Sequence, residues 1–218
     1  RRHGDAQGVA GAVGGLVQRQ LHLVGARIQA AVLVVPAPAG HERQAGEQAG
    51  AGIEHLQPVL TPLHREIDPH IARHYSAVTV ANRVTNTEAL RERMLLRAGT
   101  RPIIGYVGRL DTQKGLHLIR HALFYALEHD AQFVLLGSGS EHGINEDFWH
   151  LKRRLNDHPD CHLEIGYDEE LAHLIYAGTD FLVMPSLYEP CGLTQMIALR
   201  YGAVPVVRAV GGLKDTVF

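Results

Sequence analysis

Short apolar runs alternate with longer amphipathic patterns through the second half of the chain. Five apolar runs predict strands: Pro102–Val107, Gln132–Leu136, Cys161–Ile165, Phe181–Met184 and Val204–Val207. Four patterns with a helical period predict helices between them: Leu116–Glu128, Asn145–Asn156, Glu169–Ala177 and Leu193–Tyr201. Strands joined by helical crossovers form parallel sheets, so the pattern predicts an α/β fold with a doubly wound parallel sheet.

One further helix is predicted before these strands. Thr85 and Glu88 have the spacing of a capping box, in which a hydroxyl and a carboxylate satisfy the first amide groups of a helix. This helix is expected to continue through Ala89–Arg97 and to stop at Gly99. We therefore interpret residues 67–100 as a linker and first helix, and residues 101–218 as the α/β domain.

Residues 1–66 differ in composition from the rest of the chain. They contain no Lys, Ser, Asn, Phe, Tyr, Trp, Cys or Met, so they have few large side chains with which to build a core. We interpret them as a low-complexity, poorly structured segment outside the native domain, of the kind that a shifted reading frame in GC-rich coding sequence produces. Translation of the other frames of the gene tests this hypothesis.

Charge and cysteine content exclude several classes of protein. The formal net charge is −2 and charged residues are 20% of the chain, which argues against a nucleic-acid-binding protein. Cys161 and Cys191 form no Cys-x-x-Cys pair, which argues against a disulfide scaffold or a cysteine zinc site and favours a reduced compartment. The apolar stretch Ile28–Pro38 is too short to span a bilayer. His117 and His121 have the spacing of a helical metal site, but the sequence offers no third ligand, so we expect no metal.

Four loops with unusual residues follow the predicted strands, and the carboxyl ends of parallel strands meet at one edge of a sheet. In the first loop, Arg109 and Lys114 stand at a glycine-bounded helix start, where unpaired backbone amides also attract anions. Solvated loop cations are the alternative interpretation. The spacing favours a diphosphate site. The loops are Gly108–Gly115, Gly137–Gly139, Gly166–Asp168 and Pro185–Thr194.

The loop Pro185–Thr194 carries the most informative residues. Glu189 precedes a Pro-Cys-Gly turn and a helix start, an arrangement that can hold sugar hydroxyls on one side and phosphate on the other. In a plainer interpretation Glu189 is a surface acid and Thr194 an ordinary first residue of a helix. Cys191 lacks a His with Asn or Asp as partners for nucleophilic catalysis. Tyr167, which follows a glycine at a strand end, is either a core aromatic or a ring that stacks on a nucleobase.

Six motifs occur in order along the second half of the chain: Gly108–Gly115 (GRLDTQKG), Gln132–Gly137 (QFVLLG), Tyr167–Glu170 (YDEE), Pro185–Gln195 (PSLYEPCGLTQ), Arg200–Arg208 (RYGAVPVVR) and Gly211–Thr216 (GGLKDT). With these motifs the segment from about Asp68 to Phe218 resembles the C-terminal domain of bacterial glycogen synthases and plant starch synthases, retaining glucosyltransferases with the GT-B fold. The resemblance implies a Rossmann-like sheet, the C-terminal half of a GT-B fold, with residues 101–218 as its nucleotide-sugar-binding domain.

The resemblance also implies roles for individual residues. Glu189 would be the catalytic residue and would contact the transferred glucose. The donor-binding residues would be Arg109, Lys114, Tyr167, Cys191, Gly192, Leu193 and Thr194. Of these, the two cations would bind the diphosphate, the tyrosine would pack on the base, and the last four would lie near the sugar and the phosphates. The reaction would transfer glucose from ADP-glucose to the non-reducing end of an α-1,4-glucan, with retention and without a cofactor or metal.

The chain departs from the family in two respects. Ile197 stands where many related glycosyltransferases have a second Glu, a difference that the synthase branch shares. The family's N-terminal domain, which binds the glucan and carries a Lys-x-Gly-Gly-Leu loop and a catalytic histidine, does not match residues 1–66, and Phe218 precedes the helix that completes the fold. We therefore expect the isolated chain to be inactive, since the α-1,4-glucan partner would bind through the missing domain.

Two other interpretations stay open. A noncatalytic nucleotide or nucleotide-sugar binding module would keep the phosphate loops without an acceptor domain. Another GT-B enzyme, such as sucrose synthase, would share the phosphate motifs, although the run Cys191–Gln195 favours the synthase branch. These motifs do not separate ADP from UDP as the donor nucleotide. We expect a cytoplasmic location in a bacterium or a plastid location in a plant, with no membrane and no nucleic-acid partner.

Overall fold

The computed structural model describes residues 63–139 and 142–217, so nearly all of the low-complexity segment 1–66 lies outside the described residues. The five predicted strands form one parallel sheet in the order β3-β2-β1-β4-β5. This confirms the predicted doubly wound α/β fold. The strands are β1 (Ile103–Val107), β2 (Gln132–Gly137), β3 (Cys161–Ile165), β4 (Phe181–Met184) and β5 (Val204–Val207), each within one residue of its predicted bounds.

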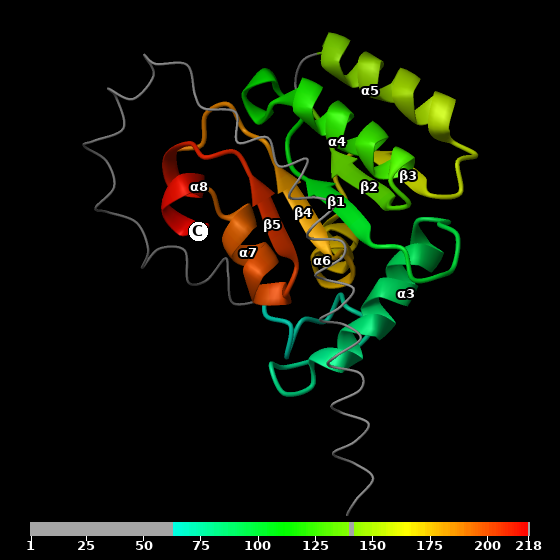
Figure 1. Cartoon of the computed structure of the whole chain (residues 1–218), viewed down its shortest axis with the longest axis vertical. Helices are drawn as coiled ribbons and strands as arrows, with labels where there is room; N and C mark the ends of the chain where they lie inside the picture. The colour runs from blue at the N-terminus through cyan, green and yellow to red at the C-terminus, as the bar shows by residue number, and fades with distance from the viewer. Residues whose placement is uncertain (1–62, 140–141, 218) are drawn as a thin grey trace, which may run out of the picture. The chain divides into compact units, whose positions relative to one another are not determined.

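Helices cover both faces of this sheet (Figure 1). α4 and α5 lie on one face, and α6 and α7 lie on the other, as right-handed crossovers require when the chain moves outward from β1 in both directions. The order therefore reverses between β1 and β4, which makes that position the topological switch point of the sheet. The helices are α3 (Arg83–Arg93), α4 (Leu116–Glu128), α5 (His142–Leu155), α6 (Glu169–Gly178), α7 (Thr194–Tyr201) and α8 (Gly211–Thr216).

The first helix differs from its prediction at both ends. α3 begins at Arg83 because the Arg83 guanidinium donates to the carbonyl oxygens of Thr179 and Tyr201, and these tertiary contacts extend the helix before Thr85. The predicted capping box is therefore wrong. The predicted stop at Gly99 is also wrong, because the helix ends at Arg93 and the exposed Leu95 adopts a left-handed φ of 54°. Burial of the apolar residues on either side of Leu95 stabilises that turn.

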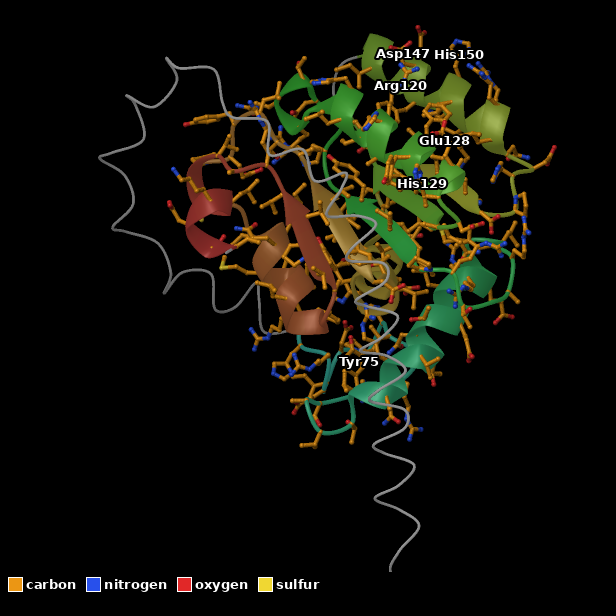
Figure 2. All side chains as sticks on the ribbon, in the orientation of Figure 1. Tyr75, Arg120, Glu128, His129, Asp147 and His150 are labelled. Carbon is orange, nitrogen blue, oxygen red and sulfur yellow. The ribbon has the colours of Figure 1, made fainter. Side chains whose placement is uncertain are left out.

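The linker before α3 is held by a buried polar cluster. Asp68 is fully buried, and its carboxylate accepts hydrogen bonds from the His70 amide (2.9 Å), from Nδ1 of His173 (2.8 Å) and from the hydroxyl of Tyr201. The Tyr75 hydroxyl, labelled in Figure 2, donates to the Tyr201 carbonyl oxygen at 2.6 Å. One carboxylate thereby ties the linker to both α6 and α7. We call Asp68, His173 and Tyr201 the anchor cluster.

α8 was not predicted as a helix, since two glycines in six residues disfavour one. It forms under the loop that follows β4: the Gly212 amide donates to the Glu189 carbonyl oxygen at 3.0 Å. A Cβ on Gly212 would lie 2.1 Å from the Cys191 carbonyl oxygen, so only glycine allows this approach. Within residues 63–139 and 142–217, none of the helices has the length and apolar character needed to cross a membrane.

Candidate functional site

The loops that follow the strands converge at the carboxyl edge of the sheet, as predicted. The Leu110 amide donates to the Ser138 carbonyl oxygen at 2.8 Å, and the Gly166 amide donates to the Gly137 carbonyl oxygen at 3.0 Å. The Leu187 amide donates to the Gln113 carbonyl oxygen at 2.7 Å. The last bond joins the loop after β1 to the loop after β4, and these two loops flank the switch point.

Gly115 allows the loop after β1 to approach the loop after β4 closely. A 3₁₀ turn, η3 (Thr112–Lys114), precedes α4, and Gly115 ends the turn and starts the helix with φ +70° and ψ 51°. A Cβ at this position would lie 2.3 Å from the Pro185 carbonyl oxygen. Both the left-handed backbone and the contact between loops therefore require glycine.

Lys114 and Glu189 meet at the switch point. The Lys114 ammonium donates to Oε2 of Glu189 at 2.5 Å, and the two side chains are mostly buried. The hydroxyl of Ser186, which is itself buried, donates to the same oxygen at 3.0 Å. The predicted catalytic carboxylate and the predicted phosphate-binding cation thus belong to one hydrogen-bonded group.

Arg109 is paired as well. Its Nη1 lies 3.0 Å from Oδ2 of Asp111, while its side chain is 72% exposed. The other carboxylate oxygen, Oδ1, accepts a hydrogen bond from the Lys114 amide at 3.2 Å and so caps η3. We call Arg109, Asp111, Lys114 and Glu189 the ion-pair site.

Tyr106 is buried next to the ion-pair site, and the charges of that site shift its pKa. Its hydroxyl donates to the Arg109 carbonyl oxygen at 2.6 Å, which fixes the start of the loop. Burial raises the pKa of Tyr106 well above its ordinary value, and the negative charges of Asp111 and Glu189 raise it further. Because burial and both negative charges raise its pKa, the phenol stays protonated and keeps donating.

The other predicted site residues lie in the loops after β3 and β4 and at the start of α7. Tyr167 follows β3 and is 86% exposed, so it is a surface residue rather than a core aromatic. Cys191 is an exposed free thiol, and its carbonyl oxygen and that of Gly192 accept from Nε2 of Gln195 at 3.2 and 2.9 Å. Leu193 and Thr194 form the start of α7. Their contacts with a donor stay predictions.

The structure adds three residues to which the sequence pattern did not assign a role: Ser186, Asp111 and Gln195. Asp111 carried a usable signal, because an Asp three residues before the end of a short turn commonly caps it. Ser186 and Gln195 carried none, since their partners depend on the path of the loop. Among the described residues no group of three or more His, Cys, Asp or Glu side chains could hold a metal ion.

The chain is similar in sequence to known proteins. The family described as glycosyl transferases group 1 matches residues 89–217. Glycogen synthase 1 of Nitrosococcus oceani is 62% identical over 153 residues, which are 70% of this chain and 31% of that protein. Glycogen synthase 2 of Methylococcus capsulatus is 61% identical over 152 residues, again 70% of this chain and 31% of that protein. The chain thus spans about a third of the length of these curated relatives.

A solved structure is similar too. The catalytic domain of starch synthase IV from Arabidopsis thaliana, bound to ADP and acarbose, superposes with a TM-score of 0.71 and 42% identity. The match covers 73% of this chain and 33% of that chain.

Proposed function

Because the chain belongs to the glycosyl transferases group 1 family, we propose that its α/β domain is the donor-binding half of a glycogen or starch synthase. The proposed reaction transfers glucose from ADP-glucose to the non-reducing end of an α-1,4-glucan. The relatives named glycogen synthase and the starch synthase IV complex with ADP support this assignment.

One observation carries the proposal. Lys114 and Glu189 come from the loops after β1 and β4 and meet at the topological switch point, where doubly wound sheets bind nucleotides. A cation and a carboxylate at this place match the two halves of a nucleotide sugar: the ammonium suits the diphosphate and the carboxylate suits the sugar hydroxyls.

The proposed roles of the cations and amides depend on the charge of the leaving group. Breaking the bond between glucose and ADP leaves negative charge on the diphosphate, so fixed cations and amides near that group lower the barrier. Arg109, Lys114 and the amides at the start of α7 are proposed to do this, Tyr167 to pack on the base, and Glu189 to hold the glucose. The proposed reaction uses ADP-glucose as its donor substrate and no cofactor.

Replacing Lys114 with alanine is expected to weaken ADP and ADP-glucose binding roughly 10- to 100-fold, since a hydrogen bond to a charged group contributes about 1.5–3 kcal/mol. The loss of the cation also leaves Glu189 to repel the diphosphate. Isothermal titration calorimetry of the chain with ADP, UDP and ADP-glucose measures the change and identifies the preferred base.

Lys152→Ala is the matched control, because Lys152 also pairs with a glutamate, at 2.9 Å from Oε2 of Glu164, but on α5 and β3. It should bind ADP like the wild-type chain. No binding of any nucleotide to the wild type would contradict the proposed function, and unchanged binding in Lys114→Ala would remove Lys114 from the site.

Replacing Ser186 with alanine is expected to weaken ADP-glucose binding about three- to tenfold while ADP binding stays unchanged, because Ser186 donates directly to the carboxylate proposed to hold the glucose and not to Lys114. Calorimetry with the two ligands separates these effects. Ser76→Ala, which alters an exposed hydroxyl pair with Thr79, is the control. Equal losses for ADP and ADP-glucose would contradict the assigned role of Glu189.

The glucan acceptor is proposed to bind through the N-terminal domain that such synthases carry, rather than through the α/β domain alone. A location in the bacterial cytoplasm, or in a plastid, belongs to the same proposal.

A further inference from the structure

Each cation of the ion-pair site forms an ion pair with a carboxylate. Lys114 pairs with Glu189 at 2.5 Å, and Arg109 pairs with Asp111 at 3.0 Å. The local formal charge of these four side chains is therefore zero, so they attract a diphosphate less strongly than the two cations alone would. Glu189 has a proposed role toward the sugar, but Asp111 has none.

The Asp111 side chain is held in place by burial and by a hydrogen bond. Its side chain is only 17% exposed, and Oδ1 is held by the Lys114 amide. Oδ2 is buried and has no directed hydrogen bond, since its contact with the Arg109 guanidinium is an ion pair without hydrogen-bond alignment. Arg109 is mostly exposed and can turn toward a ligand. When it does, Asp111 stays behind as a fixed negative charge beside the phosphates.

We propose that Asp111 is a specificity-determining residue that lowers the affinity of the site for a nucleoside diphosphate more than for the nucleotide sugar. The inference rests on the proposed function. The terminal phosphate of the free diphosphate ionises a second time with a pKa of about 6, whereas the same phosphate in a nucleotide sugar is esterified and carries one charge. A fixed carboxylate therefore repels the product more strongly than the donor, and it favours product release.

The size of the effect follows from Coulomb's law. Two unit charges about 4 Å apart interact by about 1 kcal/mol in water and by more in a partly buried site. One additional charge on the product thus corresponds to roughly a five- to tenfold difference in affinity.

Asp111→Asn tests the proposal because asparagine keeps an acceptor for the Lys114 amide and removes the charge. Asp111→Ser provides a second neutral cap. Calorimetry with ADP, ADP-glucose and adenosine should show ADP bound about five- to tenfold more tightly by both variants, ADP-glucose at most about threefold more tightly, and adenosine unchanged. The gain for ADP should shrink at high salt, where the Debye length falls to about 3 Å at 1 M.

Asp130→Asn is the matched control. Asp130 is exposed, precedes β2 at the opposite edge of the sheet, and has a left-handed φ of 55° that asparagine tolerates. Thermal unfolding checks that all variants fold.

The failure of the proposed function and the failure of this inference give different results. If the wild-type chain binds neither ADP nor UDP, the proposed function fails and this inference fails with it. If it binds UDP instead, the comparison is made with UDP and UDP-glucose. If the wild type binds but Asp111→Asn binds the diphosphate no more tightly than before, or gains equally for the diphosphate and the nucleotide sugar, the inference alone is overturned.

Discussion

Replacing Asp68 with alanine is expected to destabilise the α/β domain by about 3–5 kcal/mol, because it removes the shared acceptor of a buried hydrogen-bonded cluster. The substitution leaves the His173 ring, the Tyr201 hydroxyl and the His70 amide buried without their acceptor. Such orphaned groups each retain their desolvation penalty. Urea unfolding, followed by far-UV circular dichroism, measures the shift in the midpoint.

Asp68→Asn is the matched control, because the amide keeps the size of the side chain and one acceptor oxygen. We expect it to lose less stability than Asp68→Ala. A loss below about 1 kcal/mol for the alanine variant would mean that the linker is not held by the anchor cluster.

The same carboxylate makes stability depend on pH. Burial alone would raise the pKa of Asp68, but hydrogen bonds from His173, Tyr201 and the His70 amide outweigh burial and lower the pKa below its ordinary value. The unfolded chain, with an Asp pKa of about 3.9, therefore takes up a proton at higher pH than the folded chain. The contribution of Asp68 is fully present above that pH and is lost as the pH falls through the folded value. The stability difference between the wild type and Asp68→Asn should narrow over the same acidic range.

Replacing Gly115 with alanine is expected to abolish measurable ADP-glucose binding and to destabilise the domain. The left-handed backbone alone costs an alanine about 1–2 kcal/mol. The added Cβ would also lie 2.3 Å from the Pro185 carbonyl oxygen, so the loops after β1 and β4 must move apart. This separation would break the contact between Lys114 and Glu189 on which donor binding is proposed to depend. Calorimetry and thermal unfolding measure the two effects.

Gly202→Ala separates backbone strain from the contact between loops. Gly202 has nearly the same left-handed φ, +76°, but a Cβ there would approach only the flexible Arg83 side chain, at 3.8 Å. This variant should lose only the stability that a left-handed backbone costs an alanine, about 1–2 kcal/mol, and should keep its affinity for the donor. If Gly115→Ala binds ADP-glucose like Gly202→Ala, the close approach at Pro185 does not control the site.

Much of the fold could be read from local sequence. Burial periodicity is a property of consecutive residues, so the strands and most helices were predicted within a few residues. Errors arose where distant contacts outweighed local preference. Arg83 extends α3 backward through carbonyl groups at the C-terminal ends of α6 and α7, and α8 forms despite two glycines because it packs beneath the loop that follows β4.

By itself, the sequence determined the alternation of strands and helices and the loops that carry Arg109, Lys114 and Glu189, because these depend on neighbouring residues. Only the tertiary structure decided that β1 and β4 are adjacent, that Lys114 reaches Glu189 across 75 positions, and that Asp111 and Asp68 each hold several partners. Strand order and side-chain pairing come from long-range packing, in which each contact depends on the whole arrangement of the sheet and helices. Local sequence patterns therefore do not predict that arrangement.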